Sequence, residues 1–262
     1  MQTYRLNGKA RKTIGLAVTS ALVFSAIALL VEFWAPLGTM DGAISQWTQG
    51  LRSNLLDAIM IVATSMADAR VLVITDVLIV LLIFATAHRR LALASAFLLV
   101  GCAGLVQGIK WLTYRSRPIA DLYGGLSAFS FPSGHAANGA AMLLVLLWLA
   151  HHTLAPPMRR AIVAILLALA LLIGGSRIYL LAHWPSDVVA GLCLALFAAA
   201  LSSLVLNGHS HRLHPGIFWL AFACWGTVGG AYTVLRLNQS LDSGRNCHQV
   251  ESSDSSVSSS TS

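Results

Sequence analysis

The sequence predicts an all-α fold, a polytopic bundle of transmembrane helices with a six-helix core and an additional spanning helix near the C-terminus. Hydrophobic residues make up 56% of the 262 residues and charged residues only 10%, whereas soluble domains carry about 25% charged residues. Mean hydropathy is +0.73. The apolar residues also fall into runs of about 20, the length that a helix needs to cross a bilayer.

The expected core covers residues 14–206, and its spans are taken from the apolar runs. We expect spanning helices at residues 14–34, 71–87, 91–112, 133–151, 161–181 and 185–206. A cleaved signal peptide is the alternative for the first run, although that run is long for one. Gly104 and Gly108 lie one helical turn apart, and small residues at this spacing let helix backbones approach closely.

Basic residues mark the ends of these runs, so the net charge of +7 indicates membrane topology and not a nucleic-acid partner. Residues 1–13 are predicted to form a basic cytoplasmic tail. Following the helices in alternation places the basic clusters on that same, inner side: the N-terminal tail, Arg89 and Arg90, Arg159 and Arg160, and Arg212.

Three segments fall outside the six spans. Residues 41–68 show apolar residues at helical spacing, which predicts an amphipathic helix on the outer surface or a packing connector. Residues 207–237 hold an inner loop and the seventh apolar run. Residues 238–262 are rich in serine and are predicted to be disordered. The four cysteines show neither metal-ligand nor disulfide spacing, and nothing in the sequence specifies an oligomeric state.

Polar chemistry gathers in three pieces of the core: residues 110–118 (KWLTYRSRP), 132–135 (PSGH) and 176–187 (SRIYLLAHWPSD). The alternation of helices places all three on the outer side. Lys110, Arg117 and Arg177 are cations near membrane depth, where an unpaired charge costs several kcal/mol. Arginines in excess of carboxylates suit a phosphate ligand. Arg115 fits a side chain that extends to the membrane surface.

The second and third pieces carry groups that suit phosphoryl chemistry. Ser133 is a favoured N-cap and Gly134 permits close approach, so the first turn of the helix can seat an anion beside His135. Asp187 follows His183 by four residues and can orient one imidazole nitrogen, leaving the other free to attack. His135, His183 and Asp187 could also bind a metal, but three nearby cations disfavour a divalent ion, and we expect metal-independent chemistry without a cofactor.

The pattern Lys110-x6-Arg117-Pro118, then Pro132-Ser133-Gly134-His135, then Ser176-Arg177-x5-His183-x3-Asp187 resembles the tripartite signature of the type 2 phosphatidic acid phosphatase family. The resemblance covers the six-helix core. It implies that His183 is the nucleophile that forms a phosphohistidine, assisted by Asp187, and that His135 protonates the leaving oxygen. It also implies a phosphate-binding role for the remaining motif residues: Lys110, Arg117, Ser133, Gly134 and Arg177.

By this resemblance the protein is expected to be a membrane hydrolase of lipid phosphates or diphosphates in a bacterial inner membrane, with its active site on the periplasmic face. The family implies phosphatidic acid, phosphatidylglycerol phosphate, undecaprenyl diphosphate or lipid A as substrate. A phosphotransferase on the same scaffold remains open, as does a non-catalytic transporter or lipid-binding protein. A vanadium-dependent haloperoxidase shares similar motifs but is typically soluble.

Asp76, inside the second span, is expected to lie at an interface between helices or with lipid. Asp121 and Tyr123 could border the entrance to the site.

Overall fold

The computed structural model describes residues 8–119, 129–204, 206 and 213–258, and only the backbone of Lys9 and of residues 239–258. Within these residues the chain forms nine helices and no strand, which confirms the all-α prediction. The helices are α1 (Gly8–Phe33), α2 (Ala35–Gln49), α3 (Asn54–Ser65), α4 (Ala69–Ala85), α5 (Arg89–Thr113), α6 (Gly134–Thr153), α7 (Pro156–Tyr179), α8 (Pro185–Leu204) and α9 (Gly216–Ser258).

Six of these described helices are long and apolar enough to cross a membrane, namely α1, α5, α6, α7, α8 and the first part of α9. Helix α4 has 17 residues, which at 1.5 Å per residue is about 25 Å and near the lower limit for a span. The chain is therefore an integral, multi-pass membrane protein.

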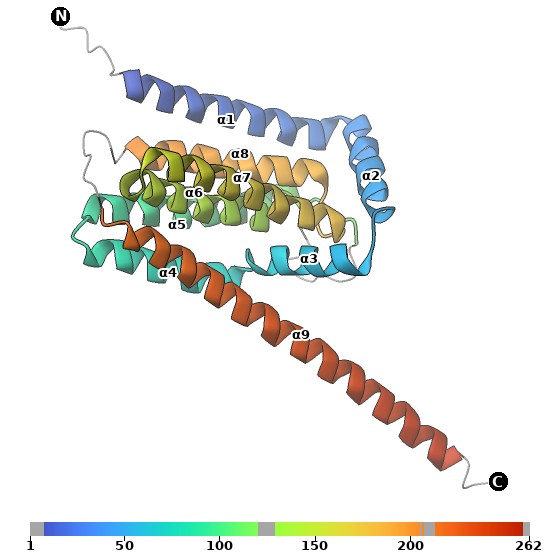
Figure 1. Cartoon of the computed structure of the whole chain (residues 1–262). Coiled ribbons are helices and arrows are strands. Elements are labelled where there is room, and N and C mark those ends of the chain that lie inside the picture. The colour runs from blue at the N-terminus through green and yellow to red at the C-terminus, as the bar shows by residue number, and fades with distance from the viewer. Residues whose placement is uncertain (1–7, 120–128, 205, 207–212, 259–262) are drawn as a thin grey trace, which may run out of the picture.

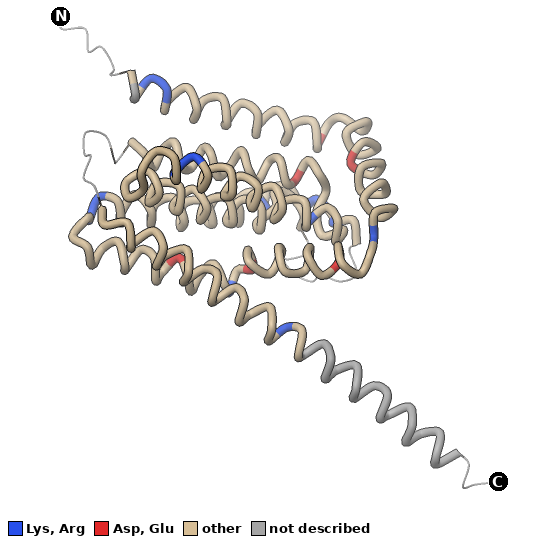
Figure 2. The backbone as a smooth tube through the Cα atoms, in the orientation of Figure 1, with Lys and Arg blue, Asp and Glu red and all other residues tan. Residues whose placement is uncertain are grey.

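Most helices lie side by side, so that the bundle has two ends (Figure 1). We call one the site end: it carries α2, the segment between α5 and α6, and the turn between α7 and α8. The other, the basic end, carries the turns between α4 and α5 and between α6 and α7. Figure 2 shows Lys and Arg at the starts of α1 and α5, at the basic end. The expected clustering therefore holds for the described residues; Arg5 and Arg212 lie outside them.

The segment 41–68 differs from the single surface helix that its pattern predicts. Helix α2 ends at Gln49 with Gly50 as its C-cap. Helix α3 begins after Ser53, whose side chain caps it by accepting a hydrogen bond from the Leu56 N–H at 3.3 Å. Helix α2 lies across the site end, whereas α3 runs beside the bundle in line with α4 (Figure 1) and packs against α7 and α9. Only α2 has the position expected of a surface helix.

The C-terminal segment also differs from expectation. Helix α9 begins near the seventh predicted run and continues to Ser258, through most of the residues that were predicted to be disordered. No proline interrupts the segment after Pro215, and extending an existing helix costs far less than starting one. Low hydrophobicity therefore did not by itself exclude helix here.

Helices α6 and α8 form the centre of the bundle and position the site. Helix α8 packs against α1, α5 and α6, and α6 packs against α5, α7 and α9 as well. Their contact is close because Gly191 on α8 faces the start of α6. Gly104 and Gly108, in contrast, have open space where a Cβ would lie, so the expectation of close packing at that pair is wrong.

Replacing Gly191 by alanine is expected to destabilise the protein by about 1–3 kcal/mol, the usual range for overpacking. A Cβ at Gly191 would lie 2.7 Å from the Ser133 carbonyl oxygen, which accepts the first helical hydrogen bond of α6 from Ala137. Thermal unfolding of the purified protein in detergent measures the effect. Gly104→Ala is the matched control and should be neutral or slightly stabilising; equal melting temperatures for the two variants would contradict the prediction.

Candidate active site

The structure brings the three polar pieces together at the site end. Lys110 lies in the last turn of α5, and Arg117 follows in the irregular segment after it. Ser133 is the N-cap of α6, and Arg177 lies in the last turn of α7. His183 precedes α8, and Asp187 lies in its first turn. The motif residues on helices therefore lie at helix ends, and Arg117 and His183 lie in the connecting segments next to them.

A cavity of about 400 Å³ lies among these pieces, between α4, α5 and α6. Five predicted site residues line it: Lys110, Arg117, Gly134, His135 and His183. Ser133, Arg177 and Asp187 are not among its lining residues. The volume is sufficient for a phosphoryl group and the adjoining part of a larger molecule, since one water occupies about 30 Å³.

His183 is 1% exposed, and the partners of its ring nitrogens define its tautomer. Arg117 Nη1 lies 3.0 Å from Nε2. A guanidinium can only donate, so Nε2 accepts and the proton of the neutral ring is on Nδ1. Nδ1 lies 3.4 Å from the Ser130 hydroxyl and 3.6 Å from Asp187 Oδ2. The nitrogen that carries no proton therefore faces Arg117 beside the cavity.

The electrostatic surroundings keep His183 neutral. Burial lowers the pKa of His183 well below its usual value, and the positive charges of Arg177, Arg117 and Lys110 lower it further. A neutral imidazole has the electron pair that a nucleophile needs. The three cations that suit a phosphate thus also favour the neutral form of the imidazole.

Asp187 is fully buried and has a partner for each oxygen. Arg115 Nη1 donates to Oδ1 at 2.6 Å, and the Trp184 N–H donates to Oδ2 at 3.0 Å. The Ser130 hydroxyl also donates to Oδ2. The expected approach of His183 and Asp187 is therefore present, with Ser130 placed beside both groups.

Ser130 and Arg115 both bond Asp187, but the sequence did not predict either of them as part of the site. Arg115 does not extend to the membrane surface, so that expectation is wrong: its side chain is 15% exposed and pairs with both Asp187 and Asp41. A signal was present, because Arg115 stands two residues before Arg117 in a piece already identified. Ser130 had none, since a serine in a loop rich in Gly and Ser looks ordinary.

The three predicted cations are each held by a neutral oxygen. Lys110 Nζ donates to the Phe129 carbonyl at 2.5 Å, Arg117 Nη1 to the Ala182 carbonyl at 2.6 Å, and Arg177 Nη1 to the Thr64 hydroxyl at 2.6 Å. A neutral acceptor orients a cation without cancelling its charge. All three side chains are less than 9% exposed, so their field acts in a medium of low dielectric constant.

The PSGH piece begins α6 as predicted. The Ser133 hydroxyl accepts a hydrogen bond from the Ala136 N–H at 3.5 Å, which confirms the N-cap. The Ser133 N–H donates to the Asp187 carbonyl at 3.0 Å, which ties the start of α6 to α8. His135 then lines the cavity from the first turn of α6.

Asp76 lies on the cavity wall together with Gln107 and Asn138, although its sequence position suggested an interface. Asp76 Oδ1 and Asn138 Oδ1 are buried without a hydrogen-bond partner among the described residues. These groups extend the polar lining away from the motif residues. Asp121 and Tyr123, predicted at the entrance, lie outside the described residues.

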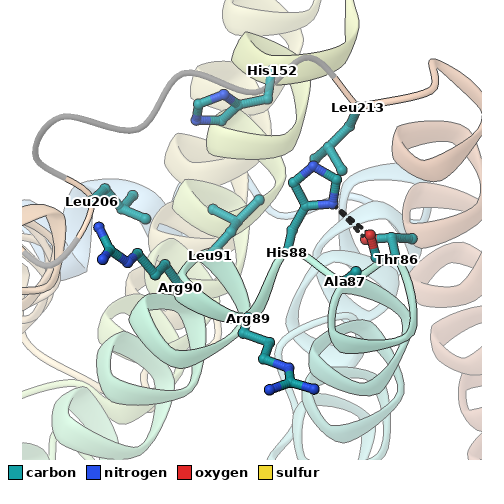
Figure 3. A pocket seen from close by; sticks show the side chains of 9 residues that line it. All are labelled: Thr86, Ala87, His88, Arg89, Arg90, Leu91, His152, Leu206 and Leu213. Carbon is teal, nitrogen blue, oxygen red and sulfur yellow. Dashed lines mark hydrogen bonds between the residues drawn. The ribbon is translucent and has the colours of Figure 1, made fainter.

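A second cavity, of about 280 Å³, lies at the basic end (Figure 3). It is bordered by His88, Arg89, Arg90 and His152, and by the apolar side chains of Leu91, Leu206 and Leu213. His88 Nδ1 lies 2.8 Å from the Thr86 carbonyl oxygen. No carboxylate is among its described lining residues, so it lacks the histidine–aspartate pair of the first cavity.

Fold and site together define a multi-pass membrane protein whose cavity combines buried cations with a carboxylate-supported histidine. The PAP2 superfamily model matches residues 91–210, a segment that contains every motif residue.

Two similar proteins come from Bacillus subtilis. Phosphatidylglycerophosphatase B of strain 168 is 36% identical over 72 residues, which are 27% of this chain and 36% of that protein, so the match spans about a third of the relative's length. The crystal structure of a transmembrane PAP2-type phosphatidylglycerolphosphate phosphatase superposes with a TM-score of 0.61 at 28% identity, covering 71% of this chain and 94% of that one.

Proposed function

We propose that this protein is an integral membrane phosphatase that hydrolyses a lipid phosphate through a phosphohistidine on His183. The observation that carries the proposal is the cavity in which His183 Nε2 faces Arg117, with Lys110 and His135 also among its lining residues. Its cations suit the charge of a phosphoryl group, and the neutral imidazole suits nucleophilic attack.

In the proposed reaction, His183 Nε2 attacks phosphorus and the bond to the lipid oxygen breaks. His135 protonates that oxygen, so the lipid leaves as an alcohol or a monophosphate. Water then attacks the phosphohistidine, His135 takes up its proton, and inorganic phosphate is released. Lys110, Arg117, Gly134, Ser133 and Arg177 stabilise the phosphoryl oxygens. Asp187 stabilises the positive charge that develops on the imidazole.

Metal independence is part of the proposal. Lys110, Arg117 and Arg177 already supply the positive charge that a divalent ion would bring, and their charges would repel such an ion. Phosphate release should therefore be the same with and without a chelator.

Phosphatidylglycerol phosphate is the first substrate to test, because both similar proteins carry it in their names. Phosphate release from purified protein in mixed micelles should be measured on this lipid, phosphatidic acid, undecaprenyl diphosphate and lipid A. Release from at least one of them is expected. Transfer of phosphate to an added hydroxyl acceptor instead of water would identify a phosphotransferase, and lipid binding without turnover would overturn the enzyme proposal.

We further propose that the basic end faces the cytoplasm and the site end the periplasm. The support is that the short turns at the basic end carry the pairs Arg89–Arg90 and Arg159–Arg160, since short cytoplasmic loops carry an excess of positive charge. The Lys and Arg that Figure 2 shows at the site end include the buried cations of the site itself. A reporter fused after Leu237, at the other end of the span that begins at Gly216, is then expected on the periplasmic side. Activity of a cytoplasm-specific reporter at this position would reverse the assignment.

A further inference from the structure

Helix α2 lies outside the segment that the family model matches, yet one of its faces reaches the site. Asp41 and Ser45 on this face are 2% and 3% exposed. The opposite face carries the exposed apolar residues Met40, Ile44 and Trp47. A buried carboxylate is costly unless it is paired, so the partners of Asp41 indicate what α2 does at this end of the bundle.

Those partners belong to the site. Asp41 Oδ1 accepts from the Ser186 N–H at 3.0 Å, and Oδ2 accepts from the Ser186 hydroxyl at 2.5 Å and from Arg115 Nη2 at 2.7 Å. The other terminal nitrogen of Arg115 donates to Asp187 Oδ1 at 2.6 Å. One guanidinium thus joins the carboxylate of α2 to the carboxylate that supports His183.

The net charge of the group formed by Asp41, Arg115 and Asp187 matters for catalysis. An arginine paired with Asp187 alone would offset the negative charge that supports the imidazole. With two carboxylates and one guanidinium, the group keeps a net negative charge beside Nδ1 of His183. The two carboxylate side chains are 3% and 0% exposed, so water screens them little.

We propose that Asp41 is a positioning residue for His183: through Arg115 it holds Asp187 in place and preserves the negative charge that assists formation of the phosphohistidine. This rests on the proposed function. The other charged or titratable groups that act on His183 are Lys110 of α5, Arg117 after it, His135 of α6, Arg177 of α7 and Asp187 of α8. Positive groups dominate this set, so one further carboxylate has a large relative effect.

The test is Asp41→Asn in the full-length protein, assayed on whichever lipid phosphate the parent hydrolyses. Asparagine has the same shape and keeps an oxygen that can accept from Ser186. We expect kcat to fall about 10- to 100-fold, as for other residues that orient a catalytic group, with little change in KM. We also expect the acid limb of the kcat–pH profile to move to lower pH by roughly half a unit, because losing a negative charge disfavours protonated His183.

Two further variants separate charge from shape. Asp41→Glu keeps the charge and alters the shape, so its acid limb should stay at the parent's position even if kcat falls. Asp57→Asn is the matched control. Asp57 pairs with Arg52 at 2.9 Å and accepts a hydrogen bond from the Tyr179 hydroxyl at 2.5 Å, and neither partner bonds Asp41, Arg115 or Asp187. Removing the charge of Asp57 should leave both kcat and the acid limb unchanged.

An acid limb that stays in place in Asp41→Asn, whether kcat is normal or reduced, would overturn the positioning role and leave a purely structural one. If Asp41→Asn does not fold, Asp41→Gln compared with Asp41→Glu gives the same decision, because the two differ only in charge. A parent protein that releases no phosphate, or a His183→Ala variant that remains active, would count against the proposed function instead.

Discussion

Replacing His183 by alanine is expected to reduce phosphate release at least about 10³-fold, since removing a nucleophile eliminates the covalent route. The protein should remain folded, because the change removes a ring without leaving a charge behind. Release of phosphate from lipid micelles measures the loss. Acid-quenched reactions of the parent should contain no stable phosphoenzyme, whereas alkaline quenching should preserve one, as expected of a phosphohistidine.

The pH dependence of the parent offers a second readout on His183. Because burial and the neighbouring cations lower the pKa of His183, the neutral, reactive form persists below the usual imidazole pKa of about 6.5. The kcat should rise with pH through this lowered pKa and then level off. An acid limb at or above pH 6.5 would contradict the electrostatic description of the site.

Arg177→Lys is expected to lower kcat/KM by about 10²-fold, the usual effect of losing one preorganised donor to a transition state. Lysine keeps the positive charge but has a single ammonium nitrogen. The planar guanidinium of Arg177 bonds the Thr64 hydroxyl with one nitrogen and has further nitrogens that can donate to a second acceptor. Phosphate release at low substrate concentration measures the effect.

Arg52→Lys is the matched control for Arg177→Lys, because it makes the same change at an exposed arginine. Arg52 pairs with Asp57 on the surface, and its side chain is 44% exposed, so activity should stay near that of the parent. A similar loss in both variants would show that the Arg177 result is not specific to the site.

The sequence predicted which polar residues lie together at one end of the bundle better than it predicted the helices around them. Lys110, Arg117, His135 and His183 stand out because charged or titratable groups are rare in an apolar chain, and the alternation of spans already places them at one end. The cavity they share could not be predicted, because its shape depends on how α4, α5 and α6 pack.

The predictions that were wrong also have physical causes. Arg115 looked like a surface side chain because its partner, Asp41, is 74 residues away in sequence. Residues 41–68 have one helical periodicity, and only the cap at Ser53 reveals that they form two helices with different directions. Close packing occurs at Gly191, a single glycine without a repeat, and not at the spaced pair Gly104 and Gly108.

The break between α2 and α3 has a consequence for anyone who wishes to build a minimal version of this protein. Residues 91–210 contain every motif residue, but Arg115 and Arg177 each bond a residue on an earlier helix, Asp41 on α2 and Thr64 on α3. A chimaera that joined residues 91–210 to foreign N-terminal helices would contain the complete signature. Its Arg115 and Arg177 would lack the partners Asp41 and Thr64 that orient them. The smallest segment that keeps both contacts therefore begins no later than α2.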